Sequence, residues 1–117
     1  MVNLVKQRIK VGQVFANPGG GTSEVVSITD TGIYFKRRNS KMLLKFEDME
    51  NTYNTFRGKK ITTKELKEFN AKCFDSSKGG HSCNCTFLFS VLKMCDLIKG
   101  DISGEGKVNS LFSVELI

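Results

Sequence analysis

The segment from Asn84 to Ile98 limits the possible folds of this chain more than any other stretch. Drawn as a helix, it carries apolar residues around most of its circumference and only a thin polar stripe with Thr86, Ser90 and Lys93. A helix that is apolar on nearly every side has to be buried on most sides. We therefore expect this helix to be the central element of the fold.

The residues before position 46 show the alternation that is typical of a β-sheet. Ile33 and Phe35 point to one face of a predicted strand, whereas Tyr34 and Lys36 point to the other. Further strand candidates lie at 11–15, 24–28 and 42–45, separated by a glycine-rich loop at 17–23 and by two turns. This pattern predicts an N-terminal antiparallel meander. It leaves residues 1–10 open as an added strand, a short helix or a loose arm.

The period changes to that of a helix at Phe46. Apolar residues from Phe46 to Phe56 follow one helical stripe, and Gly58 is well placed just after the helix end. A second helix starts at the capping box Thr62-x-x-Glu65 and ends near Asn70. We expect an irregular stretch over 71–82, the apolar helix over 84–98, and a C-terminal hairpin formed by 101–103 and 111–116.

These elements predict an α+β protein. A small antiparallel β subdomain occupies residues 1–45, and a three-helix half that ends in a β-hairpin occupies residues 46–117. We expect the two parts to form one compact unit.

The order of elements in residues 46–117 resembles the winged helix-turn-helix. The resemblance rests on that order and on the segment MCDLIKGDISGEGKVNSLFSVELI, which looks like a recognition helix running into a wing. It implies that the third helix enters the DNA major groove and that the wing contacts the backbone. The implied contact residues are His81, Ser82, Asn84 and Thr86 at the helix start, Ser90 and Lys93 along the helix, and Lys107 in the wing.

Positive charge is concentrated in the middle of the chain. The formal net charge is +6, and residues 36–78 hold twelve basic and six acidic side chains, whereas residues 79–117 are slightly acidic. An excess of this kind favours a polyanionic partner. We expect phosphate contacts from Lys36, Arg37, Arg38, Lys41, Arg57, Lys59 and Lys60. The pair Gly79-Gly80 either offers free N–H groups to an anion or only permits a tight turn.

We therefore predict a non-enzymatic, nucleic-acid-binding module, with DNA preferred over RNA, no cofactor and a homodimer as an open alternative. The rival hypothesis is a protein–protein interaction module, such as a small mobile-element protein that inhibits or regulates a larger enzyme complex. Charge location separates the two. Basic residues that cluster with the start of the third helix favour nucleic acid, whereas scattered ones favour a protein partner.

The cysteines and the single histidine raise two further alternatives. Zinc could bind Cys73, His81, Cys83 and Cys85, although the spacing C-x₇-H-x-C-x-C lacks the usual C-x₂₋₄-C knuckle. A nucleophilic Cys/His pair would need an orienting third group that the sequence does not indicate. The glycine-rich loop lacks the G-K-[ST] of a P-loop.

No stretch of the sequence suggests export or membrane insertion. The first residues lack the apolar core of a signal peptide, and no run reaches the roughly 18 apolar residues of a membrane span. We expect a cytoplasmic protein with reduced thiols and no membrane contact.

Overall fold

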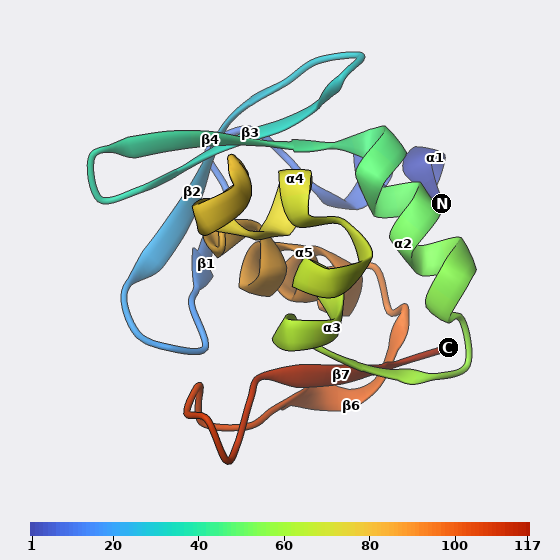
Figure 1. The fold of residues 1–117 in the computed structure, drawn as a ribbon. Coiled ribbons are helices and arrows are strands. Elements are labelled where there is room, and N and C mark those ends of the chain that lie inside the picture. The colour runs from blue at the N-terminus through green and yellow to red at the C-terminus, as the bar shows by residue number, and fades with distance from the viewer.

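The N-terminal part is the predicted antiparallel meander. The computed structural model describes all residues, 1–117, and Figure 1 shows their arrangement. Strands β1 (Val14–Ala16), β2 (Thr22–Ile28), β3 (Gly32–Arg37) and β4 (Ser40–Lys45) form one sheet in the order β1-β2-β3-β4. The chain therefore folds with both sheets and helices, and the α+β prediction is confirmed.

The two faces of this sheet differ as the alternation predicts. Ile33, Phe35 and Leu44 are fully buried on the inner face. Lys36 and Lys41 lie opposite each other on β3 and β4 and are exposed on the outer face. Because successive side chains on a strand point to opposite faces, the alternation gives the sheet one apolar and one polar face.

The first two predicted helices form where their capping signals lie. Helix α2 spans Phe46–Phe56, and Gly58 follows it with a φ of +75°, a conformation that suits glycine. Helix α3 spans Thr63–Phe69. Its capping box is complete, because the Thr62 side chain accepts a hydrogen bond from the Glu65 N–H and the Glu65 carboxylate accepts one from the Thr62 N–H.

The predicted irregular stretch over 71–82 is partly helical. It contains α4 (Ala71–Phe74) and a short 3₁₀ helix, η1 (Ser76–Lys78). The Asn70 side chain accepts from the Cys73 N–H and starts α4, while the Asp75 carboxylate accepts from the Ser77 N–H at 2.9 Å and starts η1. Each of these short turns is formed around a local cap, which the hydrophobic pattern does not reveal.

A second, three-stranded sheet closes the C-terminal part. Strands β6 (Ile98–Ser103) and β7 (Ser113–Leu116) form the predicted hairpin, and β5 (Lys60–Thr62) pairs with β7, giving the order β5-β7-β6. Strand β5 is absent from the sequence prediction. The N-terminal residues form helix α1 (Val2–Arg8), which is the short-helix alternative for residues 1–10.

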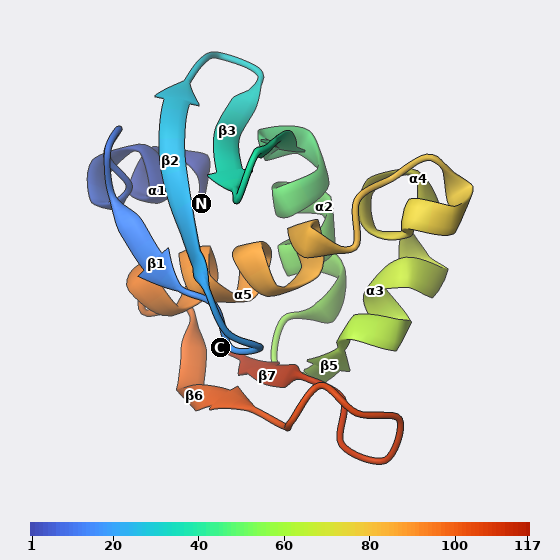
Figure 2. The ribbon, with the colours of Figure 1, turned by 90° about the vertical axis from the view of Figure 1, so that its left-hand side faces the viewer.

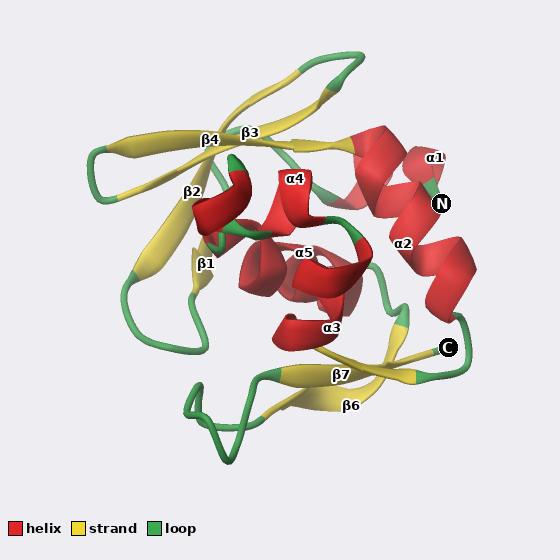
Figure 3. Cartoon of the chain, in the orientation of Figure 1, coloured by secondary structure: helices red, strands yellow, loops and turns green.

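Helix α5 (Cys83–Met94) is the central element, as its apolar circumference predicts. It lies between the two sheets (Figures 2 and 3), and eight of its twelve residues are buried. The Phe87 ring stacks on Phe35 with 3.7 Å between centroids. The helix ends at Met94 rather than at Ile98, because Asp96 takes a positive φ of 57° and Ile98 begins β6.

One hydrophobic cluster holds the two parts together. Its 25 buried residues come from α1, both sheets and the helices between them. None of the helices has the length and the apolar character needed to cross a membrane.

Candidate functional site

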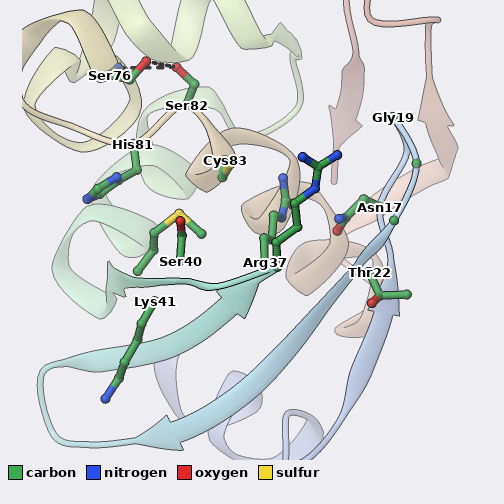
Figure 4. A pocket seen from close by; sticks show the side chains of 14 residues that line it. Asn17, Gly19, Thr22, Arg37, Ser40, Lys41, Ser76, His81, Ser82 and Cys83 are labelled. Atoms are coloured by element: carbon green, nitrogen blue, oxygen red, sulfur yellow. Dashed lines mark hydrogen bonds between the residues drawn. The ribbon is translucent and has the colours of Figure 1, made fainter.

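A hollow with a volume of about 920 Å³ lies at the end of the four-stranded sheet. Three segments that are distant in sequence form its walls: the glycine-rich loop 17–22, the β3–β4 hairpin and the chain entering α5. Figure 4 shows Asn17 and Gly19 on one side, Arg37 between the walls, and His81 to Cys83 on the other side. We call this the basic hollow.

Its lining is positively charged. Arg37, Arg38 and Lys41 contribute to the walls together with His81, and no Asp or Glu does. None of the three cationic side chains forms an ion pair, whereas Lys93 and Lys107 on the other half bind Asp101 and Glu105. A concave surface of one sign concentrates the field of its charges. The basic hollow is therefore suited to an anionic group.

Arg37 is held in place by neutral partners. Its Nε donates to the Ser23 Oγ at 2.6 Å, and its Nη2 donates to the Thr86 Oγ1 at 2.9 Å. The Ser23 hydroxyl in turn donates to the Asn17 Oδ1 at 2.6 Å. Burial lowers the pKa of the guanidinium, an effect that the nearby Cys83 opposes. Arginine nevertheless keeps its charge in proteins.

This arrangement leaves hydrogen-bonding capacity for a ligand. A guanidinium carries five N–H donors, and Arg37 uses two of them for Ser23 and Thr86, with the Cys83 thiol as a further neighbour. The remaining donors have no carboxylate to satisfy them. Because its orientation is already fixed, Arg37 loses little side-chain entropy when an anion binds.

The glycine-rich loop needs its glycines for backbone reasons. Gly20 and Gly21 have φ values of 107° and 73°, a region that residues with a side chain rarely adopt. The turn closes through the Asn17 N–H, which donates to the Gly21 carbonyl at 2.9 Å. The loop thereby brings the Asn17 side chain to Ser23 and, through it, to Arg37.

A second glycine brings the start of α5 to the hollow. A Cβ on Gly80 would lie 2.7 Å from the Ala71 carbonyl oxygen, so only glycine fits there. The Gly80 N–H donates to the Asp75 carbonyl, and the next residue, His81, donates to the Cys73 carbonyl. Gly79 takes a positive φ of 88°, which fits the tight-turn interpretation of Gly79-Gly80. The Gly80 N–H already has a protein partner and is not free for an anion.

Two predicted base-contacting residues lie inside the protein. Asn84 is 2% exposed and donates to the Leu43 and Cys73 carbonyls, while Ser90 is 7% exposed. Thr86 is half-buried and bonded to Arg37. The prediction that Asn84 and Ser90 contact bases is therefore wrong. The four-stranded sheet covers the helix face that a groove-reading helix would have to expose.

The predicted basic residues do not form one surface. Arg57, Lys59 and Lys60 lie outside the basic hollow, after α2 and on the second sheet. The Arg57 guanidinium lies 5.3 Å from the Tyr53 ring. Lys36 is exposed on the outer face of the first sheet. Among the predicted residues, the hollow brings together Arg37, Arg38, Lys41, His81 and Ser82.

The zinc alternative is wrong. The structure contains no group of three or more His, Cys, Asp and Glu side chains that could hold a metal ion. All four cysteines are free. Burial raises the pKa of the Cys73 and Cys85 thiols to about 12.

Sequence reasoning missed the neutral residues of the hollow. Asn17, Thr22 and Ser40 line it, and Ser23 supports Arg37 from behind. The glycine-rich loop was the available signal, but it indicated only a turn and the absence of a P-loop. Comparison of the chain with protein-family models, with curated proteins and with solved structures finds no match.

Proposed function

We propose that this protein is a non-enzymatic, DNA-binding module whose phosphate contacts are made in the basic hollow. One observation carries the proposal: Arg37, Arg38 and Lys41 line a concave surface that has no carboxylate, and none of them is neutralised by an ion pair. Phosphate contacts of this kind supply most of the affinity in nonspecific DNA binding.

The groove-reading mode implied by the winged-helix resemblance has to be given up. Helix α5 is enclosed by both sheets, and its exposed residues are too few to read a base pair. The resemblance itself rests on the element order predicted from the sequence and stays a proposal. Phosphate contacts carry no sequence information by themselves. We therefore expect weak sequence preference.

A protein partner is the second candidate. Lys59 and Lys60 lie away from the basic hollow, and a scattered set of basic residues is what this alternative predicts. An acidic protein surface would use the same unpaired cations. DNA binding that depends on the residues of the hollow supports the DNA-binding hypothesis over the protein-partner hypothesis.

The test is a titration of the purified protein with labelled duplex and single-stranded DNA at low and at higher salt. Binding at low salt that weakens as salt rises supports the proposal, because cations that contact phosphates displace counterions. Absence of binding to both forms at low salt would overturn it and favour the protein partner.

A further inference from the structure

The outer face of the four-stranded sheet carries a tyrosine among lysines. Tyr34 lies on β3 opposite Leu43, and the next cross-strand pair on the same face is Lys36 and Lys41. Lys45 follows on β4, two residues beyond Leu43 and on the same face. These lysines are exposed and the tyrosine is partly exposed. Glu24 on β2 lies opposite Lys36 on the same face, so the charges around the ring are mixed but positive in sum.

This face continues into the basic hollow. The Lys41 Nζ lies over the Tyr34 ring, 5.0 Å from its centroid, so a stacking base has to displace this ammonium or use the other ring face. Lys41 also lines the hollow. In Figure 4 the Lys41 side chain points away from Arg37. Strand β4 is an edge strand, so only this one strand separates the two surfaces. An extended chain can thus contact the outer face and the hollow together.

We propose that the ligand is a single strand, with one unpaired base stacked on Tyr34 and the adjoining phosphates on Lys36, Lys41 and Lys45. This inference rests on the proposed function and specifies its ligand. An exposed aromatic ring beside cations that track a backbone is the combination that single-strand binding uses, since every base has a stacking face. The bases of a duplex are already stacked on one another, and α5 is too buried to read them in the groove.

The protein contains a built-in probe for this contact. It has no tryptophan and only two tyrosines. Tyr53 is 7% exposed, and its hydroxyl donates to the Ile117 carbonyl at 3.0 Å. A strand that stacks on the surface tyrosine therefore quenches the intrinsic fluorescence of Tyr34 and leaves that of Tyr53 as an internal reference.

The experiment compares two ligands of about twelve nucleotides, a length within the usual site size. One is an oligothymidine, and the other is an abasic strand with the same phosphates. They are titrated into the wild-type protein, Tyr34→Ala and Tyr34→Phe. Binding to all three proteins is measured by the fluorescence anisotropy of the end-labelled strand, and quenching of Tyr34 is measured in the wild type alone. We expect Tyr34→Ala to weaken oligothymidine binding by about 5- to 150-fold, the range for one stacked base. Tyr34→Phe keeps the ring and stays within about twofold of the wild type.

The abasic strand separates the two proposals. We expect it to bind the wild-type protein and Tyr34→Ala equally, because it offers phosphates and no base. If both proteins also bind oligothymidine equally, stacking on Tyr34 is overturned and the phosphate site stands. Tighter binding of duplex than of single strand also overturns the single-strand inference alone. If neither strand nor duplex binds, the proposed function itself falls. Thermal melting of both variants shows whether the fold is intact.

Discussion

The salt dependence of DNA binding is the most direct quantitative test of the basic hollow. Arg37, Arg38 and Lys41 are the three cationic side chains that line it. Each phosphate contact adds roughly −0.7 for single strands or −0.9 for duplex to the slope of log K against log salt. The three contacts in the hollow then contribute about −2 to −3 to the slope. Between about 50 and 200 mM salt, these three contacts alone lower the wild-type affinity about 20- to 40-fold.

Replacing both arginines removes two of the three contacts. For Arg37→Gln combined with Arg38→Gln, the slope should become less negative by about 1.4 to 1.8. Fluorescence anisotropy with labelled DNA measures both slopes. Arg38→Gln alone leaves the hydrogen bonds of Arg37 to Ser23 and Thr86 in place. It should make the slope less negative by about 0.7 to 0.9, the contribution of one phosphate contact.

The matched control is Lys64→Gln. Lys64 is an exposed cation on α3 that does not line the hollow. Its replacement changes the net charge by the same amount as Arg38→Gln but should leave the slope unchanged. An equal drop for both variants would mean that net charge alone attracts DNA. A double arginine variant with the wild-type slope would refute the reasoning.

Four further predictions concern the fold. Gly80→Ala forces a Cβ to within 2.7 Å of a carbonyl oxygen and should destabilise the protein by about 1–3 kcal/mol in urea unfolding, whereas no change would mean that the turn shifts freely. Phe87→Ala empties the site that stacks on Phe35 and should cost about 3–5 kcal/mol by the same measurement; a cost below about 1 kcal/mol would contradict its central packing. A thiol reagent at mild alkaline pH should modify Cys83 quickly and the other three thiols slowly, because those are buried, and four equal rates would refute their burial. Burial also raises the pKa of Cys73 and Cys85 from 9.0 to about 12, so these thiols lose their protons at a lower pH in the unfolded state than in the folded state. The free energy of unfolding should therefore fall as pH rises from about 9 toward 12. Urea titrations across that pH range measure this fall.

The sequence predicted those helices and strands that are specified by residues only a few positions apart. The alternation of Ile33 to Lys36 gave the sheet its two faces, and the capping box at Thr62 gave α3 its first residue. The apolar circumference of the segment after residue 83 predicted a central helix, because such a surface is stable only when other elements cover it. These signals depend on residues a few positions apart, so the sequence alone contains them.

Short elements without a local signal were missed. Strand β5 has only three residues and is stabilised by pairing with β7, in which Ile61 lies opposite Val114. The start of α4 and the end of α5 depend on single side chains and on one positive φ. Hydrophobic periodicity does not report such features.

The candidate site was decided by the tertiary structure. The sequence by itself determined that the middle of the chain is basic and that one helix must be buried. Which residues share a surface depended on packing: Arg37 meets Thr86, 49 residues away, because Phe87 stacks on Phe35 and draws the start of α5 to the end of the sheet. The same packing turned Asn84 inward and left Lys59 and Lys60 elsewhere. Burial is a property of two surfaces in contact, and a sequence pattern specifies only one of them.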